Sequence, residues 1–200
     1  MQPTINSSTY YLGNEDEEHC DIVYYKKTKN YNNNDIVIVN NNSYVSDNEV
    51  KYLIKRLVAL PNQIIKFELI ETETISTLYD DVKYFYSISV YDENNNNLNL
   101  DQSYLDGTER MFTTKRLIYA CKEMYPFYYE VFSSLAENGE YLYSVPDDSY
   151  FVIGDNRNHS TDSRYFGAVK FNDIEGSVRL IVAYNQTLFK AVIIKIKSYL

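Results

Sequence analysis

A polar segment that follows directly on a strand-like run is the feature that most constrains the fold of this chain. The run 150–153, YFVI, has the apolar and aromatic composition of a buried strand, and it ends at Gly154. The segment 154–167 then reads GDNRNHSTDSRYFG, so acidic, basic and hydroxyl side chains crowd into one loop. Such a loop on a rigid strand is typical of a functional site. The alternative is a tight polar turn held together by its own Asp and Arg side chains.

The segment 154–167 resembles the last signature box of the bacterial type I signal peptidases, G-D-N-R-x-x-S-x-D-S-R-x-x-G. Three further boxes of that family are matched in the same order: MQPT at 1–4 resembles S-M-x-P-T without its serine, NDIVIV at 34–39 resembles G-D-x-V-x-V, and KRLVALPNQ at 55–63 resembles K-R-x-x-G-x-P-G-D. Four boxes in order are far more specific than any one of them. The resemblance covers 1–63 and 141–182, and the middle of the chain matches no box.

Charge and composition exclude some classes of function. The formal net charge is −9 and no basic cluster is present, which argues against nucleic acid as a partner and gives no polybasic membrane patch. Cys20 and Cys121 lack metal-binding spacing, and they could form one disulfide or remain two free thiols. The apolar segment 188–200 is interrupted by lysines and is too short to span a bilayer.

The hydrophobic pattern predicts a mostly β protein with one helical stretch. Strands are expected at 21–25, 35–39, 50–59, 66–75, 82–91, 141–145, 150–153 and 178–183. Apolar residues recur at helical spacing over 113–138, where Pro126 must kink or split the helix.

From the placement of the boxes we expect a signal-peptidase-like β core that is interrupted by an α/β insertion. The expected parts are a catalytic β core at 1–67 and 147–186, an inserted second domain at 68–146, and a C-terminal strand or amphipathic tail at 187–200.

The resemblance implies a serine endopeptidase that uses a lysine general base and no metal or other cofactor. Lys55 aligns with that base. A lysine can take a proton from a serine only when it is neutral, and burial among apolar side chains lowers its pKa. On a strand, Lys55 shares a face with Leu53 and Leu57, while Arg56 lies on the other face, where it can stay in water. The alternative is a lysine on an edge strand that extends into water.

Ser160 aligns with the family serine that hydrogen-bonds the lysine amine, so we expect the two side chains within about 3.2 Å of each other. The resemblance gives the rest of the loop structural roles. Asp162 and Arg164 align with an acid–base pair that holds the loop together, and Asp155 could accept backbone N–H bonds. The expected structural residues of the loop are Asp155, Asn156, Arg157, Asp162, Ser163 and Arg164. His159 stands at a variable position of the box and has no expected role.

The chain departs from the family pattern at several positions. The family nucleophile immediately precedes the methionine of the first box, here Met1, so we expect the chain as given to lack the nucleophile and the upstream membrane anchor, and to be inactive by itself. An internal methionine taken as the start, or a real truncation, would give this sequence. Family glycines are replaced by Asn34 and Asn62, which can hold positive φ. Ala59 and Gln63 are less readily accommodated and leave the shape of the chain after Lys55 open.

The expected function is removal of signal peptides from secretory precursors at the extracytoplasmic face of the cell membrane. An extended substrate would add to strand edges, with the groove formed around Met1, Pro3, Leu53 and Ile54. The precursors and the membrane surface are the expected partners of the complete protein. The alternative is a non-catalytic relative that keeps the fold and binds peptides or a partner without cleaving them.

Overall fold

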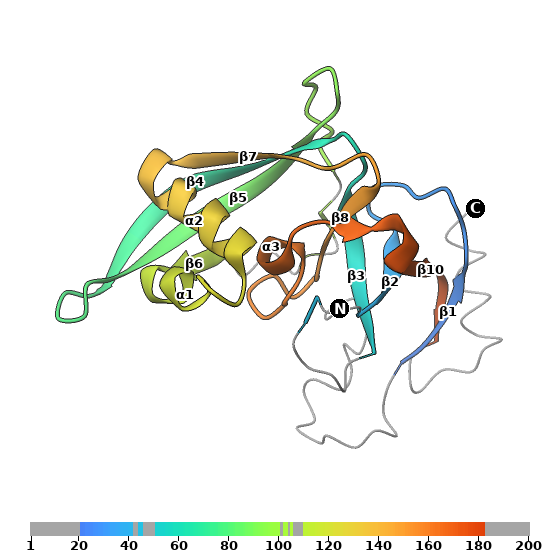
Figure 1. The fold of residues 1–200 in the computed structure, drawn as a ribbon, viewed down its shortest axis with the longest axis horizontal. Helices are drawn as coiled ribbons and strands as arrows, with labels where there is room; N and C mark the ends of the chain where they lie inside the picture. Colours follow the sequence, from blue (N-terminus) through green and yellow to red (C-terminus); the bar gives the residue numbers. More distant parts are fainter. Residues whose placement is uncertain are drawn as a thin grey trace.

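The computed structural model describes residues 21–41, 44–45, 51–100, 102–103, 105 and 110–182. These residues form two antiparallel sheets with helices packed beside the second (Figure 1). The first is six-stranded, in the order β1-β10-β2-β3-β8-β9. Its strands are β1 (Ile22–Lys26), β2 (Ile36–Asn40), β3 (Tyr52–Ala59), β8 (Ser149–Ile153), β9 (Val169–Lys170) and β10 (Ile174–Val182).

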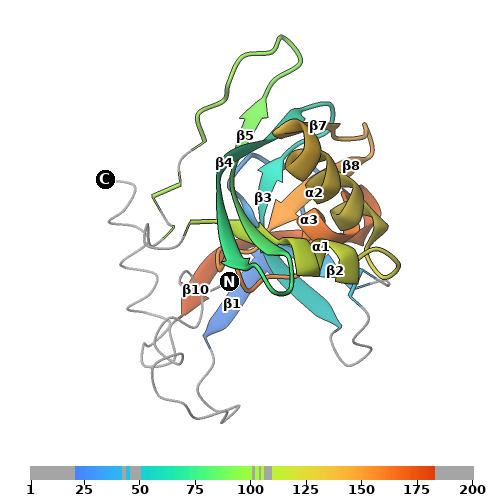
Figure 2. The ribbon, with the colours of Figure 1, turned by 90° about the vertical axis from the view of Figure 1, so that its left-hand side faces the viewer.

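The second sheet is four-stranded, in the order β6-β5-β4-β7. Its strands are β4 (Ile64–Ser76), β5 (Asp81–Tyr91), β6 (Phe112–Thr114) and β7 (Glu140–Ser144). The helices are α1 (Lys115–Ala120), α2 (Pro126–Asn138) and the one-turn α3 (Ser163–Phe166), and a 3-10 turn, η2, spans Phe171–Asp173. Seen from the side, α1, α2 and α3 lie on the same flank of the molecule (Figure 2).

The larger hydrophobic core joins the two sheets. Phe67 of β4 and Phe132 of α2 are fully buried, and they belong to the same cluster as Val58 of β3 and Phe151 of β8. A second cluster lies on the other side of the first sheet and includes Leu57, which is fully buried. Strands β3 and β8 therefore contribute to both cores, and the loop that follows β8 starts between the two sheets.

The structure confirms most of the expected elements. The helical stretch is split as expected, because Pro126 stands in the first turn of α2, where its missing N–H costs nothing. Asn34 and Asn62 have φ angles of 70° and 65°, so asparagine does hold the positive φ at both family glycine positions. Gln63 closes the turn after β3, because its Oε1 accepts the Leu60 N–H at 2.8 Å. The short elements β6, β9, α3 and η2 were not expected, since each is too short to show a period.

Some expectations fall on other parts of the chain. The first box at 1–4, Cys20 and the tail 187–200 lie outside the described residues. The division into a core and an insertion at 68–146 stays a prediction. Cys121 is a buried free thiol. Within the described ranges, no helix has the length and apolar character needed to cross a membrane.

Candidate active site

The loop after β8 is closed by hydrogen bonds between its two ends. The backbone N–H of Gly154 donates to Asp162 Oδ2 at 3.0 Å, and the buried N–H of Val152 donates to Ser163 Oγ at 3.0 Å. Asp162 also caps α3, because its carboxylate accepts the backbone N–H of Arg164. The polar residues at the end of the loop thus supply partners to β8, and the loop folds back over the strand from which it came.

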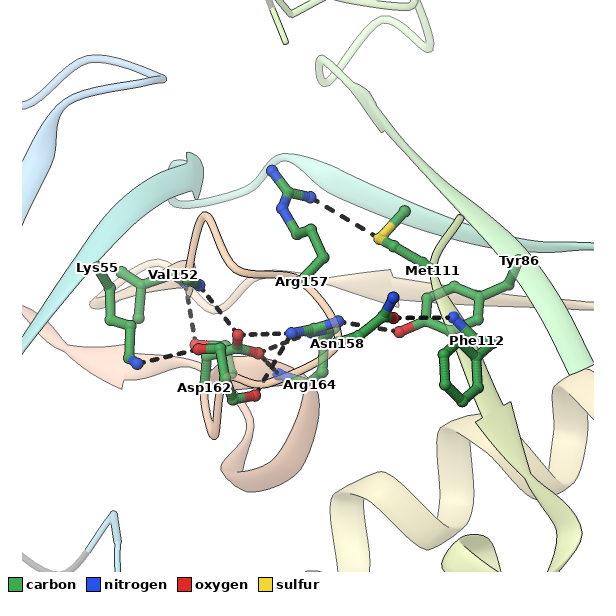
Figure 3. A network of polar contacts seen from close by, with 12 residues as sticks. Lys55, Tyr86, Met111, Phe112, Val152, Arg157, Asn158, Asp162 and Arg164 are labelled. Carbon is green, nitrogen blue, oxygen red and sulfur yellow. Dashed lines mark hydrogen bonds and ion pairs between the residues drawn. The ribbon is translucent and has the colours of Figure 1, made fainter. Parts of the chain in front are cut away.

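Lys55 and Ser160 meet between β3 and this loop. The Lys55 amine points toward the loop that carries Asp162 and Arg164 (Figure 3), and its Nζ donates to Ser160 Oγ at 3.0 Å. The expected contact is therefore confirmed. The alternative of a lysine that extends into water is wrong, because the Lys55 side chain is partly buried and contacts Ser160.

Burial lowers the pKa of the Lys55 amine below its usual range. The negative charge of Asp162 opposes this shift, the positive charge of Arg164 adds to it, and Asp155 opposes it. Burial is the largest single influence on the pKa of Asp162 and would raise it. The charge and hydrogen bonds of Arg164, the charge of Lys55 and the Gly154 N–H together outweigh burial, so the pKa of this carboxyl is lowered. The carboxylate beside Lys55 is thus already paired, and the amine is biased toward its neutral form.

Gly154 makes room for the contact between Ser160 and Lys55. A Cβ atom at Gly154 would lie 2.1 Å from Ser160 Oγ, 2.6 Å from Ser160 Cβ and 3.6 Å from Lys55 Nζ. No larger residue fits there without moving Ser160. The sequence interpretation gave Gly154 no role, although its position between a buried strand and a polar loop was a usable signal.

Arg56 forms a buried ion pair with Asp155. Its Nε and Nη2 donate to Oδ1 and Oδ2 at 2.9 and 2.7 Å, and its Nη1 donates to the carbonyl of Asn34 at 3.0 Å. The expectation that Arg56 stays in water is wrong, since the residue is only 7% exposed. It does lie on the face of β3 opposite Leu57, but the loop after β8 covers that face.

The remaining loop residues hold its shape. The Arg164 side chain forms the expected pair with Asp162, with Nε and Nη2 each 2.8 Å from a carboxylate oxygen. The Asn156 carbonyl accepts the backbone N–H of the exposed His159 at 3.2 Å. Arg157 is buried, with Nη1 3.9 Å from Met111 Sδ (Figure 3).

Among the residues that the structure describes, strand β3 has a neighbour on only one side beside Lys55. Strand β2 pairs with Tyr52 to Arg56, whereas β8 pairs only with Arg56, Leu57 and Ala59. Within the described part of the chain, no strand therefore pairs with Leu53 and Ile54 on the side away from β2. Leu53 is buried and Ile54 is half-buried, while Met1 and Pro3 lie outside the described residues.

Among the residues that the structure describes, no three His, Cys, Asp or Glu side chains are placed to share a metal ion. What the arrangement offers is a partly buried amine, a hydroxyl that accepts one of its hydrogen bonds, and a strand edge with which no described strand pairs.

Comparison with known proteins identifies relatives over most of the chain. The sequence model of the family "Signal peptidase, peptidase S26" matches residues 1–183. The chain is 32% identical over 167 residues to signal peptidase I of Buchnera aphidicola subsp. Baizongia pistaciae, and the aligned region covers 68% of this chain and 51% of that protein. It is 28% identical over 156 residues to signal peptidase I of Buchnera aphidicola subsp. Acyrthosiphon pisum, covering 66% of this chain and 48% of that protein. The chain thus spans about half the length of the curated relatives it matches.

Among solved structures, the chain is similar to a signal peptidase I from Enterococcus faecalis. The two share 24% sequence identity with a TM-score of 0.39, over 76% of this chain and 100% of that one.

Proposed function

This chain belongs to the signal peptidases of peptidase family S26, and from that membership we propose that it carries the general base of a serine endopeptidase that removes signal peptides from secretory precursors. The observation that carries the proposal is the 3.0 Å hydrogen bond from Lys55 Nζ to Ser160 Oγ. It brings together two residues from separate boxes of the family pattern, in a setting where burial lowers the pKa of the amine.

In the proposed reaction, neutral Lys55 takes the proton of a serine hydroxyl while that oxygen attacks the scissile carbonyl. The family pattern puts this serine immediately before Met1. The ammonium then returns the proton to the leaving amine, and an acyl-enzyme remains. Lys55 next takes a proton from a water molecule as the water oxygen attacks the acyl carbonyl. The ammonium then returns this proton to the serine oxygen as the ester bond breaks and the acyl group leaves as a carboxylic acid. Ser160 holds one N–H of the amine and so directs the lone pair toward the nucleophile.

The edge of β3 with which no described strand pairs supports the proposal of an extended substrate. A signal peptide segment could add as a strand beside Leu53 and Ile54, with backbone hydrogen bonds giving affinity. By the family resemblance, small side chains would occupy the first and third positions before the cut. Met1 and Pro3 remain predictions for the opposite wall of this groove.

The same membership leads us to place the activity at the extracytoplasmic face of the cell membrane. Secretory precursors would be the substrates there, and the membrane surface a further partner. Nucleic acid is not proposed, because the formal net charge of −9 opposes binding to phosphates.

The proposal is tested with two matched versions of the chain, each extended upstream by a short segment that ends in serine or in alanine directly before Met1. Both are incubated with a precursor peptide that has small residues at the first and third positions, and mass spectrometry locates the cut. We expect cleavage by the serine version alone, faster as the pH rises because Lys55 loses its proton, and abolished by Lys55→Arg.

Equal cleavage by the alanine version would refute the serine mechanism. A serine version that folds and binds the peptide, yet never cuts it, would favour the non-catalytic relative.

A further inference from the structure

The second sheet reaches into the candidate active site through Tyr86 of β5. The Tyr86 hydroxyl accepts a hydrogen bond from Arg164 Nη1 at 3.1 Å, and both residues are only 3% exposed (Figure 3). The other nitrogens of the same guanidinium hold Asp162, and Nη2 also lies 3.4 Å from the Ser160 carbonyl oxygen. Arg164 therefore connects the second sheet to the backbone of the residue that contacts Lys55.

A second contact anchors the middle of the loop to β6. Asn158 Oδ1 accepts the backbone N–H of Phe112 at 3.2 Å (Figure 3). Asn158 Nδ2 donates to the carbonyl of Arg110 at 3.1 Å. Among the described strands β6 is the outer one of its sheet, and this side chain hydrogen-bonds to the backbone at its start. The family box leaves the residue at 158 unspecified, so this contact belongs to the fold of this chain and not to the shared motif.

We propose that Tyr86 is a positioning residue for the Ser160–Lys55 pair, and that Asn158 helps to hold the same loop in place. Through these two contacts the second sheet sets the geometry of the lysine amine. The proposal rests on the proposed role of Lys55 as general base, although the geometry can be measured without a substrate.

The physical reason lies in the hydrogen bonding of Arg164. Removing the Tyr86 hydroxyl takes away an acceptor from a buried, charged donor, which costs more than the hydrogen bond itself contributes. The guanidinium then moves or admits water, and the Ser160 carbonyl loses its fixed neighbour. The Tyr86 ring packs on Phe132 with centroids 4.9 Å apart, so phenylalanine keeps the shape of the core.

A looser loop changes the surroundings of Lys55. The charged groups that act on its amine are Asp162, Arg164 and Asp155, all carried by the loop or by α3. Because burial is the main cause of the lowered pKa, water that enters beside Ser160 raises the pKa of Lys55 toward its ordinary value.

The test compares the full chain with its Tyr86→Phe and Asn158→Ala variants by NMR of isotope-labelled lysines. Lys55→Met identifies the Lys55 signal. The matched control is Tyr128→Phe, which also loses one buried hydroxyl, here bonded to Thr113 Oγ1 at 2.6 Å and not to Arg164. We expect the Lys55 titration midpoint to rise in Tyr86→Phe, by less in Asn158→Ala, and to stay unchanged in the control.

Cleavage gives the second readout, in versions that carry the upstream serine. Tyr86→Phe should lower kcat roughly tenfold or more with KM unchanged, because the catalytic geometry is displaced while the substrate edge of β3 is intact.

An unchanged Lys55 midpoint in a folded Tyr86→Phe variant, or an equal rise in Tyr128→Phe, overturns the inference. If Tyr86→Phe fails to fold, the Asn158→Ala variant provides the test, because Asn158 is partly exposed. An unchanged Lys55 titration midpoint in Asn158→Ala then overturns the inference. If the Lys55 titration midpoint rises in Tyr86→Phe but no version with the upstream serine cleaves the peptide, the positioning role is supported and the proposed function is refuted.

Discussion

Replacing Gly154 with alanine tests directly whether the loop is shaped around the Ser160–Lys55 contact. Gly154 is not among the glycines with positive φ, so alanine meets no backbone strain there. The whole effect must come from the added methyl group, which would lie 2.1 Å from Ser160 Oγ and 2.6 Å from Ser160 Cβ.

The size of the effect follows from these two distances. Ordinary van der Waals contact begins at 3.4 Å, so Ser160 has to retreat by more than an ångström. That movement breaks its 3.0 Å hydrogen bond with Lys55. A displacement of about 1 Å in a catalytic constellation costs about 100-fold in rate. Overpacking costs typically ~1–3 kcal/mol of stability, and the stiffer unfolded chain offsets ~0.4–1 kcal/mol of that.

Urea unfolding and peptide cleavage, in versions with the upstream serine, measure the two effects in a double-mutant cycle with Ser160→Gly. Glycine at 160 removes both atoms that the new methyl group would strike. Gly154→Ala should therefore destabilise the parent chain and be neutral or stabilising in the Ser160→Gly background. The same cost in both backgrounds, or parental cleavage by Gly154→Ala, would show that the reasoning is wrong.

Three further predictions concern stability. Asp155→Asn leaves buried Arg56 without its anionic partner and should lower the free energy of unfolding by about 3–5 kcal/mol. Asp80→Asn, in an exposed ion pair, should change the free energy of unfolding little. Equal losses in urea titration would show that the buried ion pair has no special weight. Lys55→Met removes an amine whose pKa is lowered by burial. At pH values between the lowered pKa and the ordinary lysine value, the unfolded chain binds more protons than the folded chain, so the parent protein gains stability as the pH rises through this window. Lys55→Met should therefore be more stable than the parent near neutral pH, and this difference should vanish at alkaline pH. A difference in melting temperature that does not depend on pH rules this out. Ser163→Ala removes the acceptor of a buried β8 amide and should cost about 1–3 kcal/mol, with faster hydrogen exchange at that amide; unchanged exchange would show that the bond contributes nothing.

Local features of the sequence predicted the elements, because their physical causes are local. The β-branched and aromatic runs became strands, Pro126 separated two helices, and Asn34 and Asn62 took the positive φ that asparagine tolerates. The contact of Lys55 with Ser160 was also foreseen, but only through the resemblance of two boxes to a known family. No periodicity in the chain itself says that β3 and the loop after β8 are neighbours.

The alternation of a strand determines which side chains share a face, but it cannot say what covers that face. Arg56 was placed on the correct face of β3 and was still expected in water, because only the folded chain brings Asp155 over it. The close fit at Gly154 and the hydrogen bond from Arg164 to Tyr86 likewise form only in the folded chain. The pairs Arg56–Asp155 and Tyr86–Arg164 join segments far apart in the sequence, and so does the approach of Lys55 to Gly154 and Ser160. The burial, hydrogen bonding and pKa of Lys55 all depend on such contacts. The sequence by itself therefore determined the residues that the site could use, and the packing of the two sheets decided their surroundings.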